Sequence, residues 1–287
     1  MEEIPSGRSM RFLVCFLSFM AVAIASSDVV NRAGGLYQHT DYESALRILT
    51  QDPAPDSPNY LLRAKTYFML GDYKKTVDAL EKISPMSSES ALWLGRAWGR
   101  RAETSTLMAA VYAPRARQFF EKAIVLDPKN REAKNDLFDY YLNAPGIMGG
   151  GIDKAEALAK SIETERPAEY EFEEAQIAGK HNDNKAAETH LRHAMELAPK
   201  DPGRIVDVAR FVARQGRLEE SDKLFAQARN LAPEKLSVIF AQAKTDIENH
   251  RNLDRARKLL QIYIRATLTP DDPSRQEAGK LLKRAGG

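Results

Sequence analysis

The chain has 287 residues, which is enough for one long domain or two ordinary ones. With 43% hydrophobic and 29% charged residues, its composition is typical of a folded protein. The 42 lysines and arginines nearly balance the 40 aspartates and glutamates, and this balance argues against a protein that binds nucleic acid mainly by neutralising phosphates.

The first 25 residues have the pattern of a secretory signal peptide. Arg8 and Arg11 precede an apolar run over residues 12–25, which ends in the small residues Ala23 and Ala25. The run is too short to cross a bilayer comfortably as a helix. We predict a signal peptide over residues 1–25, cleaved after Ala25, and an exported, periplasmic domain over residues 26–287. The alternative is an uncleaved segment that anchors the chain to a membrane.

The single cysteine, Cys15, lies inside this apolar run. Cleavage after Ala25 would therefore leave a chain without cysteine, which excludes disulfides, thiolate metal sites and cysteine nucleophiles from the mature domain. Packing alone has to stabilise its fold.

The rest of the chain is dominated by internal repetition. When Gly71 is aligned with Gly216, Ala64 falls on Ala209, and the same spacing holds over residues 61–83 and 206–228. Each segment reads as a helix with a small residue in its middle, a turn, and a second helix. Small residues let helices approach closely, and glycine can end a helix with a positive φ, as Asn182 can at modest cost. Prolines at positions 128, 199 and 233 end the second helices, and the last two are 34 residues apart.

This pattern resembles the tetratricopeptide repeat (TPR) family, whose 34-residue unit has small residues in both helices and a late proline. One such hairpin cannot bury its own apolar face, so hairpins stack. The resemblance implies an all-α fold, a right-handed α-solenoid of about seven hairpins with a C-terminal closing helix. We predict hairpins over residues 29–56, 57–88, 89–128, 129–167, 168–199, 200–233 and 234–270, and the closing helix near 272–285.

Two hairpins depart from the pattern. In the third, about nine additional residues between Arg100 and Val111 are predicted to extend the first helix, with Trp98 packed between the paired helices and Trp93 nearer the surface. In the fourth, a longer loop contains Gly146, Gly149, Gly150 and Gly151.

This glycine-rich loop allows two interpretations. Backbone N–H groups ahead of a helix can hold a small anion or a nucleotide phosphate, but the glycine spacing matches neither of the common phosphate-binding motifs. We favour an inter-helix turn in which Ile147 and Met148 pack against the stack and Asp153 caps the next helix. Anion binding stays the alternative.

Residue types that carry catalysis or bind metals are not grouped in recognisable motifs. His190 and His193 share a helix face but lack a motif that supplies a third ligand, so we predict a solvated pair. The sequence has no Gly-x-Ser-x-Gly elbow and no persuasive carboxylate pair. We predict no catalytic residue, no metal and no cofactor.

The resemblance implies that the first helix of each hairpin lines a concave groove. The inward-facing positions are Lys65, Phe68, Arg96, Asn135, Asp139, Phe172, Gln176, Arg210, Arg214, Phe240 and Lys244. The family's clamp for carboxyl termini needs lysines where Leu61 and Leu92 stand, so that activity is not expected. Apolar and cationic groups alternate along this face, which suits an extended peptide with acidic and apolar side chains.

We therefore predict a non-catalytic scaffold or adaptor that binds a protein or an extended peptide in its groove. The alternative that long cationic side chains merely keep a curved surface soluble stays open. A second alternative is a structural subunit of an envelope-associated assembly, in contact with its partners through outer surfaces and the glycine-rich loop.

Overall fold

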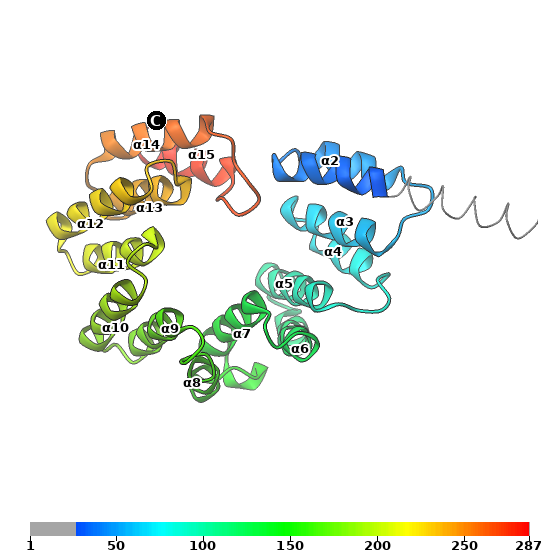
Figure 1. The fold of residues 1–287 in the computed structure, drawn as a ribbon, viewed down its shortest axis with the longest axis horizontal. Helices are drawn as coiled ribbons and strands as arrows, with labels where there is room; N and C mark the ends of the chain where they lie inside the picture. The colour runs from blue at the N-terminus through cyan, green and yellow to red at the C-terminus, as the bar shows by residue number, and fades with distance from the viewer. Residues whose placement is uncertain (1–26, 287) are drawn as a thin grey trace, which may run out of the picture. The chain divides into compact units, whose positions relative to one another are not determined.

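The structure is a computed structural model that describes residues 27–286, and this range consists of helices joined by turns (Figure 1). The predicted signal peptide and its cleavage site lie outside the described residues. From residue 27 to residue 286, each helix is too short or too polar to span a bilayer. The chain divides into two compact units, Met1–Ala133 and Lys134–Gly287.

The first unit contains three helical hairpins and the beginning of a fourth. A helix over residues 27–38 precedes the labelled helices of this unit, which are α2 (Tyr42–Thr50), α3 (Ser57–Met69), α4 (Tyr73–Leu80), α5 (Ser88–Thr104) and α6 (Ala109–Leu126). Within this unit, each hairpin packs on the next through contacts of α2 with α3 and of α4 with α5.

The second unit is also built of helical hairpins, and the boundary between the two units falls within α7. Its elements are α7 (Arg131–Asn143), the 3-10 turn η1 (Gly146–Met148), α8 (Ile152–Lys160), α9 (Pro167–Lys180), α10 (Asn184–Leu197), α11 (Pro202–Arg214), α12 (Leu218–Leu231), α13 (Leu236–Glu248), α14 (Leu253–Arg265) and α15 (Arg275–Arg284). The prediction of an all-α fold of stacked hairpins with a closing helix is confirmed.

A common turn joins the two helices of several hairpins. In this turn a residue with positive φ ends the first helix, and the aspartate after it caps the second. The pairs are Thr40–Asp41, Gly71–Asp72 and Asn182–Asp183. Asp72, for example, accepts a hydrogen bond from the Lys75 amide at 3.1 Å. Gly216 ends α11 with a φ of 78°, so the predicted helix ends are confirmed.

Small residues lie where paired helices approach most closely, as predicted. Ala64, Ala209 and Ala243 are fully buried and Ala175 nearly so. Around them, larger apolar side chains of α9 to α13, such as Ile205 and Phe225, form one core cluster of the second unit. These hairpins therefore bury their apolar faces against one another.

The long third hairpin differs from its predicted form. The first helix, α5, is extended only to Thr104, and the remaining additional residues form a turn and the start of α6. Trp98 is buried between these two helices, as predicted, with the guanidinium groups of Arg101 and Arg115 4.3 and 4.6 Å from its ring centroid. Tyr112 of α6 packs beside it at 5.1 Å. The additional length is thus shared between both helices.

The closing helix α15 packs on α13 and α14. Its apolar residues Ala278 and Leu281 are buried with Phe240 and Tyr263 in one core cluster. The Tyr263 hydroxyl donates to the Pro273 carbonyl at 2.6 Å, which fixes the segment that leads into α15.

Candidate functional site

In the first unit, the predicted groove cations already have partners. Lys65 on α3 pairs with Glu89 on α5, and Arg96 on α5 pairs with Glu132 at the start of α7 at 2.8 Å. Both cations also lie over the ring of Trp93, at 5.5 and 5.0 Å from its centroid. These interactions join successive hairpins, and a ligand carboxylate would have to displace them.

The predicted groove residue Phe68 is also engaged within the molecule, through contacts with other aromatic rings. Its ring meets Tyr73 and Trp93 edge-on, with centroids 5.3 and 5.2 Å apart, and its side chain is only partly exposed. Phe68 therefore contributes to hairpin stacking. Trp93 is partly exposed, as predicted.

At the other end of the chain, two predicted groove residues are committed to the closing helix. Phe240 is wrong as a groove residue, because its side chain is 5% exposed and its ring lies 5.0 Å from that of Tyr263. The sequence alignment placed it on the inner face of α13 but could not show that α15 covers this part of the helix. Lys244 of α13 faces Glu277 of α15 at 4.0 Å.

Arg210 and Arg214 on α11 are different. They lie one helical turn apart, and within residues 27–286 no carboxylate forms an ion pair with either guanidinium group. Partial desolvation and the charge of Arg210 lower the pKa of Arg214, which Glu248 and Asp207 oppose. These two arginines are available to an anionic partner.

Asn135 and Asp139 on α7 lie beside a network of charges that links α7, α9 and α11. Arg166, at the start of α9, donates to the Asn135 side chain at 3.0 Å and pairs with Glu169 at 3.4 Å. Arg204 of α11 also pairs with Glu169 and, at 3.2 Å, with Asp207. The guanidinium of Arg204 stacks on the ring of the predicted groove residue Phe172 at 4.4 Å, and Gln176 is half-buried.

Sequence reasoning missed Glu173, the most unusual residue of this region. Its side chain is 2% exposed, and its Oε2 atom accepts no hydrogen bond from the described part of the chain. The pKa of Glu173 is raised to about 8, mainly by burial and next by the negative charge of Glu169. Asp139 raises this pKa further, and the positive charges of Arg166 and Arg204 lower it. The hairpin alignment could have found it, because Glu173 and Asp207 occupy the position at which α3 has Leu62.

Two other carboxyl groups of the network also have raised pKa values. Reduced hydration raises the pKa of Asp139 to about 6, with further contributions from Asp136 and Glu169, although Asp139 keeps contact with solvent. Burial also raises the pKa of Asp207 to about 6, despite the nearby Arg204 and Arg210. The inner face of α7, α9 and α11 thus holds carboxyl groups that are poorly neutralised.

The glycine-rich loop uses four of its backbone amides for its own turn. The amides of residues 148–151 donate to the carbonyls of Pro145, Gly146, Pro145 and Tyr141 in turn, at 2.8 to 3.2 Å. The ammonium group of Lys154 donates to the Gly149 carbonyl at 2.9 Å. These groups are therefore occupied within the loop, and the anion-binding alternative is not supported.

The loop is an inter-helix turn, but two details of its predicted packing are wrong. Ile147 is 95% exposed, so it is not buried against the stack, and Asp153 lies in the first turn of α8 without capping it. Gly150 is required because a Cβ atom there would lie 1.9 Å from the Ala144 carbonyl oxygen. The close turn leaves Ile147 at an outward-facing corner.

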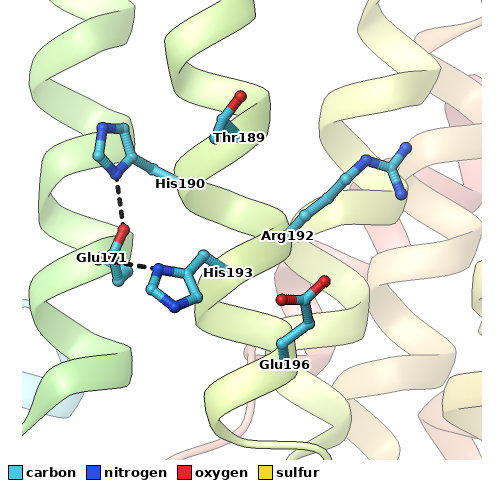
Figure 2. A pocket seen from close by; sticks show the side chains of 6 residues that line it. All are labelled: Glu171, Thr189, His190, Arg192, His193 and Glu196. Atoms are coloured by element: carbon cyan, nitrogen blue, oxygen red, sulfur yellow. Dashed lines mark hydrogen bonds and ion pairs between the residues drawn. The ribbon is translucent and has the colours of Figure 1, made fainter.

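An open hollow lies between α9 and α10 (Figure 2). Its lining residues are Glu171, Thr189, His190, Arg192, His193 and Glu196. The Nδ1 atoms of His190 and His193 lie 2.6 and 3.0 Å from the two carboxylate oxygens of Glu171, so this pair holds one hairpin together instead of being merely solvated. Over the described range, no group of three or more histidine, cysteine or acidic side chains could hold a metal ion.

Comparison with known proteins adds the following. No protein-family model matches the chain. No curated protein matches it in sequence. The solved C-terminal part of a TPR repeat-containing protein from Cytophaga hutchinsonii is 16% identical, with a TM-score of 0.47, over 88% of this chain and 99% of that one. A TPR protein from Thermus thermophilus is 19% identical, with a TM-score of 0.48, over 66% of this chain and 98% of that one. MamA AMB-1 is 19% identical, with a TM-score of 0.36, over 61% and 91%. At these values the likeness says nothing about function, which has to be inferred from the side chains.

Proposed function

We propose that the chain is a non-catalytic scaffold or adaptor that binds an extended segment of another protein across the first helices of the hairpins in its second unit. The observation that carries this proposal is the pair Arg210 and Arg214. Both are cationic groups of α11 without an ion-pair partner among residues 27–286, whereas Lys65, Arg96 and Lys244 are each committed to a neighbouring helix.

Two guanidinium groups one turn apart favour a carboxylate as their ligand. Each can donate two parallel hydrogen bonds to a planar anion, and these charge-assisted bonds are stronger than neutral ones. A bound carboxylate would also relieve the repulsion between the two cations. The partly buried ring of Phe172 on α9, over which the guanidinium of Arg204 lies, offers an apolar contact on the neighbouring first helix. The partner segment is therefore expected to combine an acidic residue with an apolar one.

Reversing the charge of Arg210 and Arg214 tests whether these residues bind the partner segment. The probe is a peptide selected from a random library of peptides of about 12 residues, long enough when extended to cross several helices. We expect the double variant Arg210→Glu/Arg214→Glu to bind that peptide at least about tenfold more weakly in fluorescence anisotropy, which corresponds to about 1.4 kcal/mol.

The matched control is Lys223→Glu/Lys258→Glu, which makes the same change of charge at exposed positions of the second helices α12 and α14. It should change the affinity less than about twofold. Equal losses in the two double variants would show a nonspecific charge effect, and unchanged binding by the arginine variant would contradict the proposal.

Export belongs to the same proposal and rests on the signal-peptide pattern of residues 1–25. The role of a structural subunit in an envelope-associated assembly stays a prediction, and the exposed Ile147 would be its natural contact residue.

A further inference from the structure

Glu173 presents a physical problem that the proposed function does not solve. It is almost completely buried, yet the structure gives its Oε2 atom no hydrogen-bond donor in the described range. Buried carboxyl groups in folded proteins are normally paired, because an unsatisfied one has lost its hydration without compensation. A missing donor at such a position indicates a ligand that supplies one.

The charged groups that act on Glu173 come from three helices. They are Asp139 of α7, Arg166 and Glu169 of α9, and Arg204 of α11. Neither arginine is free to satisfy Glu173. Arg166 is held by Asn135 and Glu169, and Arg204 by Glu169, Asp207 and the ring of Phe172.

Carboxyl groups therefore outnumber cations on this face. Asp139, Glu169, Glu173 and Asp207 share Arg166 and Arg204, with Arg210 acting on Asp207 from one turn further along α11. Asp139 has no hydrogen bond or ion pair on its carboxylate in the described structure and remains exposed. It is the solvent-exposed carboxyl group among those that act on Glu173, so an incoming ligand would meet it first.

We infer that Asp139 and Glu173, on the inner face of α7 and α9, form a receptor site for one lysine or arginine side chain of the bound protein segment. A long side chain can pass the exposed Asp139 and place its ammonium or guanidinium group against the buried Glu173 carboxylate. A metal ion fits less well, because the described residues contain no suitable group of three ligands. This inference rests on the proposed function, which it extends to the chemistry of the partner.

The two sites together fix a charge pattern in the partner. Asp139 and Glu173 lie on α7 and α9, and Arg210 and Arg214 lie on α11, the next first helix after α9 (Figure 1). These two first helices are linked directly, because Arg204 of α11 pairs with Glu169 of α9. The partner should therefore carry a basic and an acidic residue within one short extended stretch.

Binding at this site also has a protonation signature. Glu173, with a pKa of about 8, is mostly protonated near neutral pH, and a cation placed against it favours the charged carboxylate. A basic segment should therefore release a proton when it binds at about pH 7.5. The groups that face Glu173 and would share this response are Asp139, Arg166, Glu169 and Arg204.

The test uses the selected peptide and the double variant Asp139→Asn/Glu173→Gln, which keeps side-chain shape and removes both charges. Replacing the peptide's basic residue with norleucine should weaken binding to the unaltered protein at least about tenfold but weaken binding to the double variant less than about twofold. Calorimetry in two buffers of different ionisation enthalpy should show proton release with the unaltered protein alone. Glu196→Gln, a matched loss of charge on an exposed position of α10, should behave like the unaltered protein.

The outcomes distinguish the two proposals. Selected peptides without a basic residue, or an equal norleucine penalty in both proteins, would overturn the receptor site while leaving the scaffold proposal intact. A library that yields no binding peptide would overturn both. Peptides that respond to Asp139→Asn/Glu173→Gln but not to Arg210→Glu/Arg214→Glu would support this site and reject the arginine pair.

Discussion

The free energy of unfolding is expected to fall as the pH rises from about 4.5 to about 8, and Glu173→Gln is expected to remove most of that fall. Glu173 has a pKa of about 8 in the folded chain and the ordinary value of 4.5 when unfolded. Between these values the unfolded chain loses the proton that the folded chain retains, so rising pH favours unfolding. The expected contribution is on the order of 3–5 kcal/mol.

Two neighbouring carboxyl groups also make the free energy of unfolding fall as the pH rises. Asp139 and Asp207 have folded pKa values of about 6, above the ordinary 3.8, so their contributions are also present at low pH and lost by about pH 6. A decline between pH 6 and pH 8 that disappears in the Glu173→Gln variant is therefore assigned to Glu173.

Urea unfolding followed by circular dichroism measures this effect. Near pH 5 the neutral Glu173 resembles glutamine, so the Glu173→Gln variant and the unaltered protein should have similar midpoints. Near pH 8 the variant should be the more stable of the two. The control is Glu196→Gln, and parallel pH profiles for all three proteins would show that Glu173 is not a buried acid.

The second large effect is expected at Gly95 in the middle of α5. A Cβ atom on Gly95 would lie 2.4 and 2.5 Å from the Cδ1 and Cε1 atoms of Phe120, whose side chain is 6% exposed in the adjoining helix α6. Because the ring is enclosed, it cannot simply rotate away. We expect Gly95→Ala to lower the free energy of unfolding by about 2–3 kcal/mol.

A neighbouring glycine supplies the control. At Gly99, one turn along α5, the nearest atom to an added Cβ would be the Ala116 Cβ at 3.9 Å, an ordinary contact. Gly99→Ala should therefore stabilise the helix by up to about 1 kcal/mol, because alanine favours helices over glycine. Thermal unfolding of both variants should show shifts of opposite sign, and Phe120→Leu should partly restore Gly95→Ala. Shifts of the same sign would contradict the close packing of α5 and α6.

The hairpins could be predicted from the sequence because their determinants are local. Gly71 with Asp72 ends one helix and caps the next, and Ala64 and Ala209 mark where helices meet. These features lie within a few residues of the structure they specify. Trp98 was predictable for the same reason, since its place in the repeat fixes which neighbour it faces.

The proposed binding surface on the first helices was harder to predict, because the ion pairs of its charged residues depend on neighbouring hairpins. Nothing near Lys65 in sequence shows that Glu89 of the next first helix neutralises it, and Arg96 and Glu132 are a similar case. The burial of Phe240 depends on α15, about 40 residues further along the chain. Glu173 stands at the position of Leu62 in the hairpin alignment, and that is the signal by which it could have been found. The groups that oppose or share its charge lie on other helices, so the sequence did not show its environment.

The helix α15 has one apolar side and one charged side. Ala278 and Leu281 are buried against the last hairpin, whereas exposed positions include Lys283 and Arg284. A new repeat joined after α15 would meet this charged side and find no apolar face on which to stack. Lengthening by design or by duplication should therefore succeed when a 34-residue unit is inserted between existing hairpins. Tandem fusion beyond α15 should yield two arrays that fold separately.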